Sequence, residues 1–98
     1  TGGGLTENLP RVLPDDLGAE IDLDAWDLPG VFQWLAQTGG MAEAEMLKTF
    51  NCGVGMILVV APDQAEAIKV LLDQAGETVC EMGVVTKEAG IAYRGQLL

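Results

Sequence analysis

The sequence predicts an α/β (α+β) sandwich, in which helices flank a mixed β-sheet, and three observations support this fold class. Hydrophobic residues make up 49% of the 98 residues, enough for one domain to collapse around a core. Apolar residues recur at helical spacing in residues 42–50 and 62–75. Residues 19–23 alternate apolar and acidic side chains, and residues 56–60 form an apolar run, as strands do. Strands interleaved with helices favour a sheet covered by helices.

The first element is a glycine loop that leads into a short helix. The triplet Gly2–Gly4 favours a loop, and the residues that then recur at the spacing of one helical face are Leu5, Leu9, Val12 and Leu13. Pro10 fits only in or near a first helical turn, where its missing N–H is not needed, and Pro14 ends the segment.

A turn, a strand and two helices are predicted next. Residues 15–18 form the turn, and residues 19–23 form a short, half-exposed strand with Ile21 and Leu23 on one side. Residues 29–38 form a helix that Gly39 and Gly40 stop. Residues 42–50 form the second helix. The apolar faces of the two helices carry Val31, Phe32, Trp34 and Leu35, and Ala42, Met46 and Phe50, respectively.

The second half reads strand, helix, strand, turn and strand. Residues 56–60 predict a central strand buried on both faces. Residues 62–75 predict the clearest helix, with a capping box of Asp63 and Glu66 and with Gly76 just past its end. Its apolar stripe is Ala65, Ile68, Leu71, Leu72 and Ala75. We expect residues 78–86 and 91–98 to form strands that pair as a hairpin around a turn at 87–90.

The charge balance excludes several classes of partner. Fifteen acidic residues face five basic ones, for a net charge of −10, and the basic residues are scattered. Nucleic-acid binding needs a basic patch that neutralises phosphates, so we expect no nucleic-acid partner and no anionic membrane surface. Solubility is the simplest role for the acidity.

The cysteines and carboxylates predict no metal site. Cys52 and Cys80 are far apart in a chain without histidine, which leaves too few ligands for zinc. They fit small apolar residues in a reducing cytoplasm, and no basic-then-apolar leader is visible. The acidic pairs 15–16 and 22/24 suit solvated surface better than a cation site, and Trp26 and Trp34 suit a core or an interface.

Two groups of residues are candidates for ligand binding. Gly2, Gly3 and Gly4 permit close approach of a ligand to the backbone, and Asn8 and Arg11 follow one and two turns later, where Arg11 can pair with a phosphate. A plain glycine turn with an outward-facing arginine is the alternative.

The second group is the run 51–55 between a helix and a strand. Asn51 suits either a substrate amide or a cap for the preceding helix, and Gly53 and Gly55 permit tight packing or ligand approach. Cys52 has no histidine to activate it as a nucleophile, so a core position is favoured. No catalytic residue can be named from these patterns.

Three blocks resemble one enzyme family. TGGGLTENLPRVLP (residues 1–14), VFQWL (31–35) and EMLKTFNCGVGMILVV (45–60) are similar, in order and spacing, to aminoimidazole ribonucleotide synthetase, the ATP-dependent cyclo-ligase of purine biosynthesis. The resemblance extends from residue 1 to about residue 85. Glycine triplets recur in the wider superfamily, which includes selenophosphate synthetase, thiamine-monophosphate kinase, a hydrogenase maturation factor and the amidotransferase of the preceding purine step.

The resemblance implies a cytoplasmic homodimer with two domains in each subunit. The amino-terminal domain would supply most of the site for ATP and Mg²⁺, and residues 1–98 would be a single domain, the carboxy-terminal part of the longer enzyme. The substrates would be formylglycinamidine ribonucleotide and ATP. Carried onto this chain, Gly2, Gly3, Gly4, Asn8 and Arg11 would hold an anionic group such as the ribose phosphate, and Asn51 and Gly53 would line the cleft.

Three expectations complete the sequence-based interpretation. The chain starts inside a glycine loop without a methionine, which predicts a piece of a longer protein that is inactive alone and self-associates through uncovered apolar surface. Another ATP-using member of the superfamily is one alternative. A non-catalytic binding domain is the other.

Overall fold

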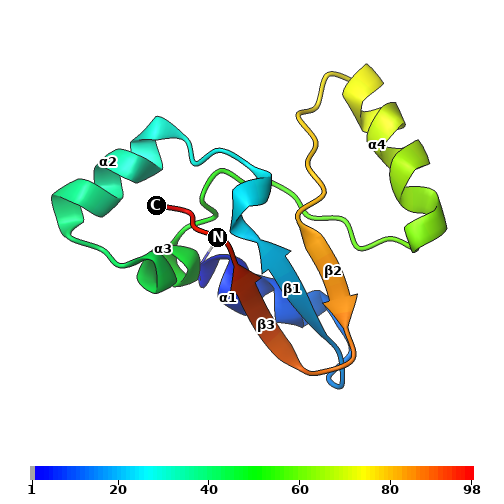
Figure 1. Cartoon of the computed structure of the whole chain (residues 1–98), viewed down its shortest axis with the longest axis horizontal. Helices are drawn as coiled ribbons and strands as arrows, with labels where there is room; N and C mark the ends of the chain where they lie inside the picture. Colours follow the sequence, from blue (N-terminus) through cyan, green and yellow to red (C-terminus); the bar gives the residue numbers. More distant parts are fainter. Residues whose placement is uncertain (1) are drawn as a thin grey trace.

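A three-stranded mixed sheet lies at the centre of the computed structural model, which describes residues 2–98 (Figure 1). The strands are β1 (Gly18–Asp22), β2 (Gly83–Thr86) and β3 (Gly90–Arg94), and their order is β2-β1-β3. Strand β1 pairs antiparallel with β2 and parallel with β3. The predicted α+β class with a mixed sheet is therefore confirmed. Thr1, the first residue of the predicted glycine block, lies outside the described residues.

The predicted hairpin of β2 and β3 is wrong, because β1 lies between these two strands. Gly18 pairs with Thr86 on one side and with Gly90 on the other, so the turn between β2 and β3 passes around the start of β1. A Cβ atom at Gly18 would meet the backbone carbonyls of Glu88 and Gly90, so the glycine makes this close passage possible. Strand β1 contributes buried Ala19 and Ile21, and its central place gives both of its edges a pairing strand.

Helix α1 (Gly4–Asn8) continues into the 3₁₀ turn η1 (Leu9–Val12), and together they pack behind the sheet (Figure 1). Pro10 lies at the start of η1, as its missing N–H requires. The predicted inward face is confirmed for Leu5, Leu9 and Leu13, which are buried. Val12 departs from this face: its side chain is 70% exposed, because it stands at the open edge of the cleft described below.

The core lies where α1, the sheet and α3 (Glu43–Thr49) meet. Met46 on α3 and Cys52 just after it are fully buried, at 0% exposure. The other buried core residues are Leu5, Leu9, Leu13, Ala19, Ile21, Leu23, Leu28, Ala36, Leu47 and Leu97. This cluster is drawn mostly from the first half of the chain, so the first half carries most of the hydrophobic stabilisation.

Helix α2 (Gly30–Gly39) begins and ends within one residue of the prediction. Gly40 closes it in the left-handed conformation, at φ 62°, as a glycine after a helix does. The predicted broad apolar face is largely uncovered. Ala36 is buried and Phe32 is half-buried, but Trp34 is 61% exposed, so of the two predicted positions for Trp34, core or interface, the core is excluded.

The predicted central strand at residues 56–60 is wrong. This segment runs as extended coil, and Met56 is 82% exposed. Sheet pairing depends on a partner strand, and residues 56–60 pair with none of β1, β2 and β3. A run of apolar residues therefore satisfies the pattern of a buried strand without becoming one.

Helix α4 (Ala65–Gln74), preceded by the 3₁₀ turn η3 (Pro62–Gln64), stands clear of the sheet (Figure 1). All of its residues are exposed or half-exposed, so the predicted apolar stripe does not pack on a sheet. Gly76 lies just past its end at φ 91°, as predicted. The predicted capping box is wrong, because Gln64 is the N-cap and its side chain makes no cap hydrogen bond among residues 2–98.

The last residues leave the sheet at Gly95 and are held by two acidic side chains. Gln96 N donates to Asp24 Oδ1 at 3.2 Å, and Leu97 N donates to Glu43 Oε1 at 2.9 Å. These bonds dock Leu97 into the core and end β3 earlier than predicted. None of the helices in the described part of the chain has the length and apolarity needed to span a bilayer.

Candidate functional site

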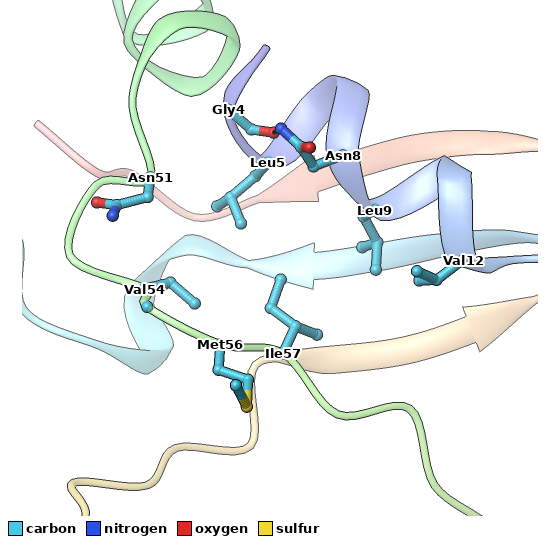
Figure 2. Close-up of a pocket in the computed structure, with 10 residues that line it drawn as sticks. Gly4, Leu5, Asn8, Leu9, Val12, Asn51, Val54, Met56 and Ile57 are labelled. Atoms are coloured by element: carbon cyan, nitrogen blue, oxygen red, sulfur yellow. Dashed lines mark hydrogen bonds between the residues drawn. The ribbon is translucent and has the colours of Figure 1, made fainter. Parts of the chain in front are cut away.

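The two sequence motifs singled out above meet at one open cleft. It lies between α1–η1 and the coil at residues 51–57, and its volume is about 170 Å³ (Figure 2). Gly4, Asn8 and Asn51, all predicted site residues, contribute to its lining. The remaining lining residues are Leu5, Leu9, Val12, Val54, Gly55, Met56 and Ile57. Every lining residue that the structure describes is therefore uncharged.

The local structure requires glycine at two positions of the glycine block. Gly4 takes φ 56° where α1 packs on α3, and a Cβ atom there would meet the backbone carbonyls of Leu47 and Phe50. Gly3 takes φ 90°, and its Cβ would meet the carboxylate side chain of Glu7. Both conformations favour glycine. Gly2 and Gly3 lie outside the lining residues, so only Gly4 of the triplet reaches the cleft.

Asn8 holds the glycine loop with its side-chain amide. Its Nδ2 donates to Gly2 O and to Gly4 O, both at 2.8 Å. Its Oδ1 accepts a hydrogen bond from Arg11 Nη1 at 2.9 Å. Arg11 is exposed and lies outside the lining residues, so the structure brings it to Asn8 and not to the cleft itself.

Asn51 stands at the opposite side of the cleft, in a tight turn (Figure 2). Its Oδ1 accepts a hydrogen bond from Gly53 N at 2.8 Å, so it fixes the turn that follows α3 instead of capping the helix. Gly53, at φ 91°, lies against Pro29, with a would-be Cβ at 2.6 Å from that ring, and is not a lining residue. The predicted cleft position holds for Asn51 and not for Gly53.

Cys52 is a core residue, as predicted. It takes the left-handed conformation, at φ 54°, and its Sγ donates to Met46 O at 3.5 Å. Burial raises the pKa of the Cys52 thiol, which keeps it in the neutral form. Trp26 Nε1 donates to Cys52 O at 3.0 Å and so ties the turn to the region after β1. Cys80, in contrast, is an exposed free cysteine.

The acidic pair 22/24 is engaged in local structure. Asp24 N donates to Asp22 Oδ1 at 3.0 Å, which caps the 3₁₀ turn η2 (Leu23–Ala25). Arg94 Nη2 lies 3.6 Å from Asp22 Oδ2. Asp24 also accepts the hydrogen bond from Gln96 N, so both carboxylates stabilise the local backbone.

Sequence reasoning missed a contact that anchors α1 to the sheet. The hydroxyl groups of Thr6 and Tyr93 lie 2.8 Å apart and share a hydrogen bond between α1 and β3. Burial raises the pKa of Tyr93, the hydrogen bond to Thr6 lowers it, and the nearby Cys52 raises it further. The two residues lie at opposite ends of the chain, so no local pattern links them.

The apolar lining was also missed as part of the site. Met56 and Ile57 were interpreted as strand residues, although they directly follow the candidate run 51–55, which contains Val54. Their position in the sequence could have identified them, because residues that directly follow a binding turn lie close to the same site. The cleft therefore combines apolar walls with side-chain amides, which suits a ligand held by shape and a few hydrogen bonds.

Comparison with known families gives one match. The family described as "AIR synthase related protein, C-terminal domain" matches residues 1–95. This span includes both sides of the cleft and all three strands of the sheet.

Proposed function

The chain belongs to the family of AIR synthase related proteins, and from this premise we propose that it is part of the ATP-dependent cyclo-ligase of de novo purine biosynthesis. That enzyme converts formylglycinamidine ribonucleotide to aminoimidazole ribonucleotide. The observation that carries the proposal is the meeting of two sequence blocks at one cleft. TGGGLTENLPRVLP supplies Gly4 and Asn8, and the block around NCGVG supplies Asn51.

We propose that the chain is the carboxy-terminal domain of a longer two-domain protein. The matching family is itself defined as a C-terminal domain, which supports this organisation. ATP and Mg²⁺ would be bound mainly by the preceding domain. The uncharged lining of the cleft supports this division, because a triphosphate needs cationic groups or a metal ion near its oxygens. The complete protein would be a cytoplasmic homodimer.

In the reaction, the uncharged lining of the cleft would hold the part of the ribonucleotide that carries no charge, while its formyl oxygen is activated by ATP. Phosphoryl transfer of this kind depends mainly on positioning and on charge stabilisation. The Asn51 amide would supply a hydrogen bond at the cleft.

Turnover by the complete protein tests the proposal. We expect formylglycinamidine ribonucleotide and ATP to give aminoimidazole ribonucleotide, ADP and phosphate, and we expect the gene to restore purine-free growth to cells that lack the cyclo-ligase. Gly4→Ala should abolish both activities, whereas Gly30→Ala, at a site with open space around the added Cβ, should retain them. Failure with this substrate but ATP-dependent turnover of selenide or thiamine monophosphate would assign the chain to another branch of the family.

The isolated chain should be inactive under the same proposal. Titration calorimetry of the 98-residue chain with ATP and Mg²⁺ should give no binding in the micromolar range. Micromolar binding would contradict the assignment of the nucleotide site to another domain.

A further inference from the structure

We propose that Asn8 is a positioning residue that holds the glycine loop at the edge of the cleft, and that Arg11 acts on the cleft through Asn8. In this arrangement Asn8 and Arg11 contact each other and the loop, and neither side chain contacts the ligand directly. The consequence for activity rests on the proposed function, whereas the coupling between the two residues does not.

Both hydrogen-bond donors of the Asn8 side chain are used inside the protein. A side-chain amide has two N–H donors, and both point to backbone carbonyls, those of Gly2 and Gly4. The amide oxygen accepts from Arg11 Nη1. A ligand that accepts a hydrogen bond from this NH₂ group would have to displace Gly2 O or Gly4 O.

The two carbonyls lie on either side of Gly3, and this fixes the loop. A trans peptide places its N–H opposite its C=O, so holding Gly2 O and Gly4 O also sets the directions of the N–H groups of Gly3 and Leu5. Gly3 is at φ 90°, a conformation that a glycine leaves easily. The Asn8 amide therefore supplies the order that the glycine block lacks.

Arg11 favours the same orientation of the Asn8 amide that the two carbonyls require. Its guanidinium binds Oδ1, so the oxygen points toward Arg11 and the NH₂ group toward the loop. The reversed amide would set an oxygen against two carbonyl oxygens and an NH₂ group against a cation. The charge-assisted bond from Arg11 thus strengthens the orientation that the loop requires.

Nuclear magnetic resonance of the ¹⁵N-labelled 98-residue chain tests the coupling directly. In the unmodified chain we expect slow hydrogen exchange for the Asn8 side-chain NH₂ group. Asn8→Ala should shift the resonances of the Gly3 and Leu5 backbone amides, because the two carbonyls that set the directions of these N–H groups are released. Arg11→Ala should perturb the same amides in the same direction.

The double variant separates the two arrangements. If Arg11 acts through Asn8, Arg11→Ala adds nothing in the Asn8→Ala background. Gln33→Ala is the matched control, because Gln33 Nε2 also donates to a backbone carbonyl, Leu28 O at 2.8 Å, but outside the cleft lining. Asn8→Asp is the second variant: it keeps an oxygen for Arg11 and loses both donors, so it should resemble Asn8→Ala. Additive effects, or loop amides unmoved by Arg11→Ala, would overturn the proposal.

The complete protein provides the functional readout. We expect Asn8→Ala to lower kcat/KM about tenfold or more for the ribonucleotide, and Arg11→Ala to lower it less and to add nothing to Asn8→Ala. Independent, multiplied losses would show that Arg11 contacts the ligand. Absence of cyclo-ligase turnover would remove the proposed function and leave the resonance measurements to decide the coupling.

Discussion

Gly4 concentrates two constraints in one residue, because it combines a positive φ with close contact between two helices. An alanine there must adopt the left-handed conformation and also push back the carbonyls of Leu47 and Phe50. We expect Gly4→Ala to lower the free energy of unfolding by at least about 1–3 kcal/mol, the cost of a strained residue alone. Urea denaturation provides the measurement, with Gly30→Ala as the control. Equal midpoints for the two variants would contradict this account.

The two groups with raised pKa values, Cys52 and Tyr93, predict a loss of stability at alkaline pH. Burial disfavours the thiolate and the phenolate in the folded state, so ionisation is easier in the unfolded chain. Stability should therefore be complete below the unfolded pKa values, about 8.5 for a thiol and about 10 for a phenol, and should fall as pH rises through the folded values.

Urea midpoints between pH 7 and pH 11 measure this loss. Tyr93→Phe removes one titrating group together with its bond to Thr6, so it should be less stable at pH 7 but lose less on going above pH 10. A midpoint that is flat across this range in the unmodified chain would show that neither group is effectively buried.

Among single residues, the sequence identified the glycine block and Asn51 but not their roles. The glycine triplet predicts a loop at residues 2–4, but it does not predict that Gly4 meets the carbonyls at the end of α3. Likewise, Asn8 and Arg11 follow the loop at helical spacing, which is compatible with contact to a ligand or to each other. The distances decide for a contact within the protein.

At the scale of elements, local signals placed the helices well and the strands poorly. Helix α2 needs only its own periodicity and a terminal glycine, and both are written in the sequence. A strand needs a neighbour. Residues 56–60 carry the stronger strand pattern, yet β1 became the central strand because it has partners on both sides. The hairpin prediction failed for the same reason, since the nearest partner in sequence is not the partner in space.

The uneven packing of the helices predicts uneven sensitivity to substitution. Leu47 on α3 is 2% exposed and Leu71 on α4 is 66% exposed. We expect Leu47→Ala to cost about 2–5 kcal/mol, because it leaves a cavity in the core. Leu71→Ala should change the free energy of unfolding by less than about 0.5 kcal/mol. Denaturation of both variants checks this pair. A large loss for Leu71→Ala would mean that α4 is covered in solution.

At the scale of the whole molecule, uncovered apolar surface predicts self-association. The exposed large side chains in the second half include Met56, Leu58, Val59, Val70, Leu71 and Val84. Large exposed apolar surface recruits other chains. The net charge of −10 opposes association, but physiological salt limits that repulsion to about 8 Å.

Light scattering against salt concentration tests this expectation. The mass should rise above the 10.3 kDa of one chain as salt and protein concentration increase. Val59→Glu should reduce the association. Glu77→Gln removes one negative charge without altering the apolar surface, so it should increase the association slightly. A monomer at all concentrations, with no binding of a hydrophobic dye, would show that the chain covers its own core.

The site is the part that sequence patterns predicted least, because it exists only where distant segments meet. Gly4 and Asn51 are both recognisable as unusual positions, but their meeting depends on α1 packing against α3. Hydrophobic periodicity does not predict that these two positions meet; only the resemblance of the sequence blocks to one family suggested it. The anchor between Thr6 and Tyr93 had no such signal.

The hydrogen bond from Trp26 to the Cys52 carbonyl provides an intrinsic fluorescent probe of the turn beside the cleft. Trp26 is half-buried and hydrogen-bonded to the turn beside the cleft, whereas Trp34 is exposed on α2. The two indoles should therefore emit at different wavelengths, with Trp34 the redder. Replacing Trp34 with phenylalanine would leave Trp26 as the one tryptophan. Its indole is hydrogen-bonded to the Asn51–Gly53 turn, so its emission would change when a ligand binds beside that turn, without any added label.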